Sequence, residues 1–167
     1  MTAVTVEKTG PVQNPLDLME EIVIANNWPF ERLSSDEMVV ECKGRWSSYR
    51  LFFFWQDDVS AMQFSCQVDM KVPSSRATAT YELLARVNER LWVGHFDVEQ
   101  DEAVPTFRHT ALLRGHTGAS VEMLEDMVDI ALNECERFYP AFHFVLSEGR
   151  SARDAIASSM LETVGEA

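Results

Sequence analysis

Two of the four histidines in this 167-residue chain have a spacing that could do chemistry. His95 and His109 fall on consecutive predicted strands, roughly symmetric about Glu102, so their imidazoles could face each other across a hairpin. Paired imidazoles can bind a metal ion or titrate near neutral pH. Asp97, two residues along from His95, is the one carboxylate that could join them at this spacing. The alternatives are therefore a small-molecule or metal sensor and two ordinary histidines on a sheet surface.

Sequence patterns typical of catalysis are absent. The chain contains no P-loop, no GxGxxG, HExxH or GxSxG motif and no EF-hand. Turn chemistry explains the adjacent carboxylates of Asp57 and Asp58, since neighbouring side chains in a tight turn point apart. An enzyme would also need an enclosed pocket with converging polar groups. We therefore expect a non-enzymatic protein with no catalytic residues, no cofactor and no metal site.

The cysteines and the lengths of the apolar runs indicate the cellular compartment in which the protein is expected. Cys42, Cys66 and Cys135 are odd in number and form no CxxC pair, which favours reduced core thiols over a disulfide framework or a zinc site. No apolar run approaches the ~20 residues of a membrane-spanning helix, and the N-terminus lacks the pattern of a secretory signal. We expect a cytoplasmic protein with no membrane partner.

The chain is strongly acidic, with 27 Asp and Glu residues against 14 Lys and Arg, a formal net charge of −13 at pH 7. Its arginines are scattered, so no basic patch is expected to attract nucleic acid. An acidic series in the last third of the chain is typical of a solvated helix face, with a docking surface for a basic partner as the functional alternative. The series is Glu125, Asp126, Asp129, Glu134 and Glu136.

The elements that must position these residues follow from periodicity. Residues 1–13 are predicted as a disordered tail, and 14–167 as a single α+β domain. Asn14 and Pro15 open a helix that ends at Asn26-Asn27. Three strands then follow on short turns and should form an antiparallel meander. They are Met38 to Gly44, Trp46 to Gln56 and Ser60 to Lys71.

The second half of the chain is predicted to return twice to the same sheet. A helix from about Ser75 to Arg90 precedes two strands, 91–99 and 104–113. A long helix capped by Ser120 is expected to break or kink at Pro140, with 141–146 also helical and Gly149 ending it. A final helix spans 151–163. The order α-βββ-α-ββ-α with a C-terminal helix predicts a five-stranded antiparallel sheet with helices mainly on one face.

The strand from Trp46 to Gln56 is apolar on both faces, although a half-solvated strand would alternate apolar with polar. Such a strand needs a cover on each side, from a second copy, a partner protein or the C-terminal helices of the same chain. One face carries Tyr49, Leu51, Phe53 and Trp55. The residues expected at a protein interface on the other face are Trp46, Arg50, Phe52 and Phe54.

Several stretches resemble the YbjN family of bacterial sensory transduction regulators, and the order of elements resembles the fold of type III secretion chaperones. The matching segments cover nearly everything after Gln13. They are NPLDLMEEIVIANNWPFER, GRWSSYRLFFFW, YELLARVNERLWVGHFDV, FRHTALLRG and the run from Val121 to Ala167.

The resemblance implies a non-enzymatic protein, since no established activity is attached to this family. The secretion chaperones are dimers that bind extended segments of other proteins. We therefore expect a protein-binding module, regulatory or chaperone-like, that acts as a homodimer with a protein partner the sequence does not name. The alternative, from another class, is a small-molecule or metal sensor using His95 and His109.

Overall fold

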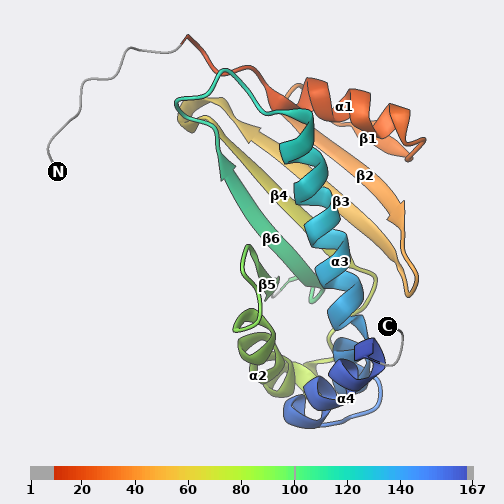
Figure 1. Ribbon diagram of the computed structural model, residues 1–167. Coiled ribbons are helices and arrows are strands. Elements are labelled where there is room, and N and C mark those ends of the chain that lie inside the picture. Colours follow the sequence, from red (N-terminus) through yellow and green to blue (C-terminus); the bar gives the residue numbers. More distant parts are fainter. Residues whose placement is uncertain (1–9, 100, 165–167) are drawn as a thin grey trace, which may run out of the picture.

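Alternating burial along the central strands divides the molecule into a covered and an open sheet face. The structure, a computed structural model, describes residues 10–99 and 101–164. Within these residues the chain forms one antiparallel sheet, α1 and α3 on one face of it, and α2 and α4 beyond its end (Figure 1). The predicted tail lies mostly outside the described residues, although the Gln13 amide donates to the Thr117 carbonyl at 2.9 Å.

The sheet has the spatial order β1-β2-β3-β4-β6-β5, with every neighbouring pair antiparallel. The prediction of an antiparallel α+β sheet is confirmed, but the residues described form six strands rather than five. Four of the expected strands are two to five residues shorter than predicted. The observed strands are β1 (Phe30–Arg32), β2 (Glu37–Lys43), β3 (Ser48–Gln56), β4 (Ala61–Val68), β5 (His95–Val98) and β6 (Pro105–Leu112).

The additional strand is β1, whose three residues are too few to show a period-2 pattern. Side-chain contacts hold it in place. The Arg32 guanidinium lies 3.0 Å from the Asp17 carboxylate and 3.1 Å from that of Glu20, both on the first helix. Because the Arg32 side chain is only 20% exposed, these pairs are partly shielded from water and stabilise the strand against the helix.

Four α-helices lie in the described part of the chain: α1 (Pro15–Ala25), α2 (Ala77–Asn88), α3 (Val121–Leu146) and α4 (Ala152–Val164). Short 3-10 turns, η1 (Asp57–Val59) and η2 (Ser74–Arg76), precede β4 and α2. The predicted caps form, since the Asn14 side chain accepts from the Leu16 amide at 2.9 Å and the Ser120 hydroxyl accepts from the Met123 amide at 3.1 Å. None of the helices described has the length and apolar character needed to cross a membrane.

The expected break at Pro140 is wrong, because α3 continues through it to Leu146. A proline removes one backbone donor from a helix, but the residues after it are held by burial. Phe138, Ala141 and Phe142 are all fully buried against the rest of the core. Gly149 follows with a φ of 70°, as expected of a glycine after a helix end.

The core lies between the covered sheet face and α3. Phe96 of β5 contacts the rings of Phe107, Phe138 and Phe142, with centroids 5.4–6.2 Å apart. The Sγ atoms of Cys66 and Cys135 lie 3.6 Å apart in the same core, and all three cysteines are free and buried. Burial raises the pKa of the Cys42 thiol to about 12, so that thiol stays protonated.

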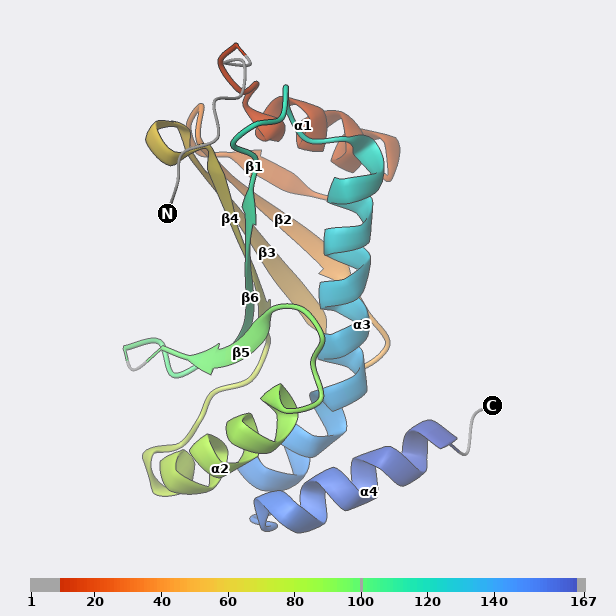
Figure 2. The ribbon, with the colours of Figure 1, turned by 60° about the vertical axis from the view of Figure 1, so that its left-hand side comes forward.

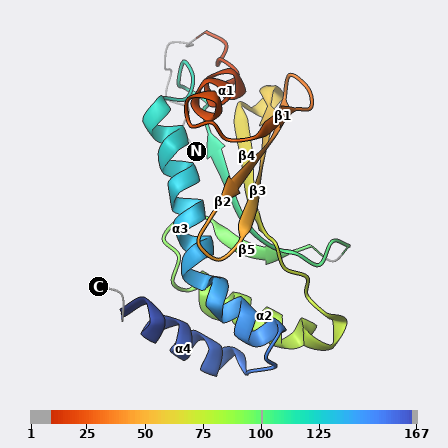
Figure 3. The ribbon, with the colours of Figure 1, turned by 90° about the vertical axis from the view of Figure 1, so that its right-hand side faces the viewer.

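The helices leave one sheet face uncovered. Figures 2 and 3 show α1 and α3 on the same side of the sheet, while α2 and α4 pack around the C-terminal half of α3 beyond the sheet's end. The C-terminal helix therefore does not cover the aromatic side of β3, which was one of the covers considered from the sequence. In residues 10–99 and 101–164, no helix lies over that face.

Candidate protein-binding surfaces

The open face has an apolar centre on β2 and β3. Val39 and Phe52 are opposite each other in the register and half-buried, and Phe54 is 37% exposed. A hollow of about 480 Å³ lies beside the two phenylalanines and extends towards His95 and Arg108. The other face of β3 carries Tyr49, Leu51, Phe53 and Trp55, as the sequence predicts, and all four side chains are buried.

Polar side chains surround this apolar centre. Arg50 is exposed and lies between Glu41 on β2 and Gln67 on β4 in the register. Phe54 lies between Glu37 and Gln63 in the same way. An apolar centre with a polar rim is the usual composition of a protein interface.

Trp46 lies apart from Phe52 and Phe54. It belongs to the turn before β3, and its ring stacks on Tyr139 of α3 with centroids 6.1 Å apart and an interplanar angle of 6°. The turn is fixed to α3, because the Arg45 amide donates to the Glu136 carboxylate at 2.8 Å. Extending the period-2 pattern of β3 back to Trp46 placed it on the wrong side. Its indole is 43% exposed and remains a predicted contact residue, at the helix side of the molecule.

His95 and His109 do not face each other across the β5–β6 hairpin. The partner of His95 in the register is Arg108, so these two side chains point to the same face of the sheet. His109 is the next residue along β6, so its side chain points to the opposite face. Burial, and then the nearby His95, lowers the pKa of His109 below its ordinary value of 6.5. No group of three or more potential metal ligands occurs among the described residues. No observation favours the sensor alternative.

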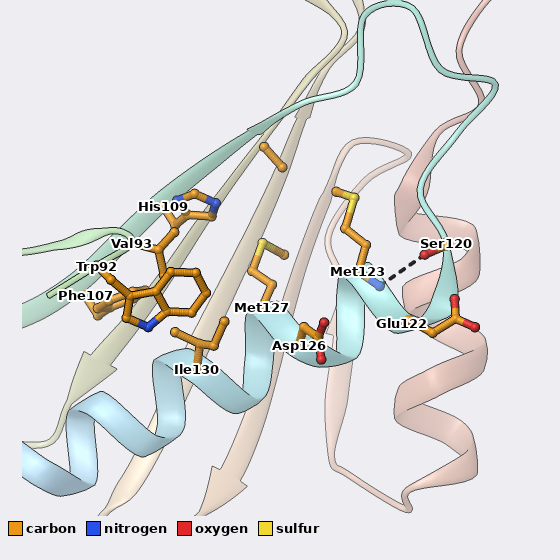
Figure 4. Close-up of a pocket in the computed structure, with 11 residues that line it drawn as sticks. Trp92, Val93, Phe107, His109, Ser120, Glu122, Met123, Asp126, Met127 and Ile130 are labelled. Carbon is orange, nitrogen blue, oxygen red and sulfur yellow. Dashed lines mark hydrogen bonds between the residues drawn. The ribbon is translucent and has the colours of Figure 1, made fainter.

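A second surface feature is a groove of about 460 Å³ between β6 and the N-terminal half of α3 (Figure 4). Its floor is the helix-facing side of β6, with Phe107, His109 and Ala111. The loop before β5 contributes Trp92 and Val93. Its α3 wall consists of Met123, Met127 and Ile130, with Ser120, Glu122 and Asp126 beside them.

The acidic residues of α3 do not form one face, because they lie on different sides of the helix. Asp126 lines the groove, whereas Glu125 and Asp129 line a smaller cavity of about 280 Å³ towards α1. Glu122, also at the groove, has its pKa lowered by hydrogen bonds from its own backbone amide and from Ser120, so it is ionised at neutral pH. Sequence reasoning missed this groove. The spacing of Met123, Met127 and Ile130 at i, i+4 and i+7 was the signal available.

The fold and its surfaces define an α+β protein with an antiparallel sheet and one open sheet face, and the residues described contain no group of three or more potential metal ligands. The chain belongs to the YbjN family, described as "Putative bacterial sensory transduction regulator", whose model matches residues 15–144. The fold is similar to the crystal structure of YbjN, a putative transcription regulator from E. coli.

That structural similarity has a TM-score of 0.51 at 12% sequence identity, and it covers 71% of this chain and 84% of the E. coli chain. At this identity the similarity shows the fold. A sequence comparison with curated proteins gives no match. The match to the family model confirms the family expected from the sequence.

Proposed function

We propose that this protein is a non-enzymatic regulator that acts by binding proteins, and that it forms a homodimer through the open sheet face. The observation that carries the proposal is the position of Phe52 and Phe54 at the centre of a face that no described helix covers. A regulatory or chaperone-like role follows from the same capacity to bind apolar protein surface.

A second copy of the chain suits this face because the face carries both signs of charge. Glu41 lies opposite Arg50 in the register, and Lys43 follows on the same side of β2. In a two-fold dimer each patch meets its own copy, so a self-complementary pattern of charge around an apolar centre is required. The hollow beside Phe52 and Phe54 provides room for aromatic side chains of the second copy.

The test is the mass in solution. Light scattering coupled to size exclusion should report about twice the 19.0 kDa chain mass for the wild type. Phe54→Asp should give a folded monomer, because a carboxylate would be desolvated at the centre of the interface. Tyr81→Asp is the matched control, since Tyr81 is 52% exposed on α2, away from this face. A monomeric wild type at micromolar concentration would overturn the proposal.

A further inference from the structure

The edge of β6 is only half covered by its neighbour. In the described part of the chain, β5 pairs with residues 105–108 of β6, whereas β4 pairs with residues 106–112. The last four residues of β6, His109 to Leu112, therefore have a strand on one side only. Exposed edges of this kind can accept another strand.

The ladder geometry identifies which backbone groups are unpaired. The Leu113 amide donates to the Ser60 carbonyl at 2.8 Å, in register with the β4–β6 ladder. Because antiparallel residues alternate between bonding inward and outward, the N–H and C=O groups of Thr110 and Leu112 point away from β4. No backbone group in the residues described pairs with them.

The outer edge of β5 is protected in a way that this part of β6 is not. The Phe96 amide donates to Asn88 Oδ1 at 2.7 Å, and Asn88 Nδ2 donates to the Phe96 carbonyl at 3.0 Å. The Asn88 amide thus satisfies the outward backbone groups of Phe96 as a neighbouring strand would. Thr110 and Leu112 have no such substitute in the residues described.

The unpaired edge opens into the groove. Gly94, with a φ of 68°, turns the chain out of the line of β5, so that Trp92 and Val93 leave β6 and form one end of the groove. Side chains of a strand alternate between faces, so every second side chain of a strand added at this edge would point towards α3. There it would meet the wall of Met123, Met127 and Ile130.

The charged side chains of the α3 wall indicate what kind of segment would bind in the groove. Glu122 and Asp126 line the groove one turn apart, and neither takes part in an ion pair within residues 10–99 and 101–164. The whole chain carries a net charge of −13, so no general positive field compensates them. A segment with a basic side chain pointing to α3 is complementary to this wall.

We propose that the free edge of β6 and the adjoining α3 groove bind an extended segment of another protein by strand addition, a segment with an apolar and a basic residue two positions apart. The two residues then point to the same side, the apolar one towards Met127 and the basic one towards Asp126. The inference goes beyond the homodimer, because the groove is on the covered side of the sheet and the dimer face is on the other.

The probe is an acetylated and amidated heptapeptide, Thr-Ile-Thr-Lys-Thr-Ile-Thr, titrated calorimetrically into the full-length protein. Wild type should bind it, and Asp126→Lys should bind it at least about tenfold more weakly. Asp129→Lys, the same change on the other side of α3, should stay within about twofold. The peptide with glutamate in place of lysine should also bind at least about tenfold more weakly.

The backbone contribution is tested separately. Thr110→Pro removes one outward N–H at an exposed position and should weaken binding at least about tenfold, whereas Thr110→Val keeps the N–H and should bind as wild type does. Circular dichroism and thermal unfolding establish that each variant is folded. Undiminished binding by a folded Thr110→Pro would mean that the groove takes side chains or small apolar molecules without strand addition, which overturns the proposal.

Two further outcomes also overturn it: no binding by wild type at about 1 mM peptide, or equal binding of the lysine and glutamate peptides. If Thr110→Pro does not fold, the glutamate peptide and Asp126→Lys still decide the question. The titrations are repeated with Phe54→Asp. Peptide binding by a monomeric Phe54→Asp separates the groove from the dimer face, so a failure of one proposal is distinguishable from a failure of the other.

Discussion

Gly94 determines where β5 begins and therefore where the free edge of β6 starts. A Cβ atom at this position would lie 2.3 Å from Phe107 Cζ and 2.9 Å from the Arg108 carbonyl, and the φ of 68° is one that L side chains rarely adopt. Gly94→Ala should therefore lower the free energy of unfolding by about 2–4 kcal/mol, combining backbone strain with overpacking. Urea denaturation measures the loss.

Gly115→Ala is the matched control for this prediction. Gly115 has a φ of 92° but no heavy atom within 4 Å of the added Cβ, so its substitution introduces strain without a clash. We expect a loss of about 1 kcal/mol. Equal losses at the two glycines would mean that the ring of Phe107 moves aside at little cost, contrary to its close packing against Phe96.

His109 should make the stability depend on pH. Its pKa in the folded protein is lowered by burial and by His95, while in the unfolded chain it returns to about 6.5. As the pH falls through that value, the unfolded chain takes up a proton that folded His109 resists, so the free energy of unfolding decreases. Glu122 and Asp126 line the same groove, and with these carboxylates in place the pKa of His109 is still lowered.

His109→Gln cannot titrate and should lose less in Tm than wild type between about pH 7.5 and about pH 5. Differential scanning calorimetry at several pH values measures the slope. His116→Gln, in the exposed loop before α3, is the control for the loss of a histidine. An unchanged slope in His109→Gln would show that folded His109 accepts its proton as easily as the unfolded chain does.

At the scale of elements, one side chain of α2, that of Asn88, makes two hydrogen bonds to the backbone of β5. The two hydrogen bonds between Asn88 and the backbone of Phe96 hold a four-residue strand that has β6 on its other side. Asn88→Ala leaves both backbone groups without these partners and should reduce stability by about 2–3 kcal/mol. Asn88→Asp keeps the acceptor for the Phe96 amide and should cost less.

Hydrogen exchange gives the local measurement. The Phe96 amide should exchange faster in Asn88→Ala than in wild type, by more than the global loss of stability accounts for. The amide of Met62 in β4, a strand with a neighbour on each side, is the internal reference. If both amides accelerate by the same factor, β5 opens only with the whole domain, and Asn88 has no separate role in holding it.

Elements with complete local signals could be predicted from the sequence. The Asn14 cap with Pro15 defined α1, and strict alternation of apolar and polar residues defined β4. Elements held by distant contacts could not. β1 depends on Arg32 reaching α1, and the apolar run 91–93 looks like strand although its residues turn away from β6 at Gly94. Helix α3 passes Pro140 because tertiary burial outweighs one missing hydrogen bond.

The two candidate surfaces, the open sheet face and the groove, also differ in how far they could be predicted from the sequence. Phe52 and Phe54 could be identified from the sequence, because the failure of alternation is a local pattern on a single strand. The groove requires knowing that β5 begins only at His95, opposite Arg108, and that Met127 and Asp126 lie beside the uncovered end of β6. Register and helix placement are long-range properties, so no window of the sequence contains them.

At the scale of the whole molecule, net charge separates the two binding events. Two chains that each carry a net charge of −13 repel each other, so salt should strengthen the homodimer by screening that repulsion. The basic heptapeptide is attracted to Asp126 and Glu122, so salt should weaken its binding. Raising the ionic strength from about 0.05 M to about 0.5 M shortens the screening length from about 14 Å to about 4 Å, which is enough to reveal both trends.

Sedimentation equilibrium gives the dimer dissociation constant and calorimetry the peptide dissociation constant, in the same buffers. We expect the first to fall and the second to rise with salt. Asp126→Lys should flatten the dependence for the peptide and leave the trend for the dimer, because that residue is on the groove side of the sheet. Two constants that move in the same direction would contradict the charge argument for one of the two associations, since repulsion between like chains and attraction of a basic peptide respond to salt with opposite signs.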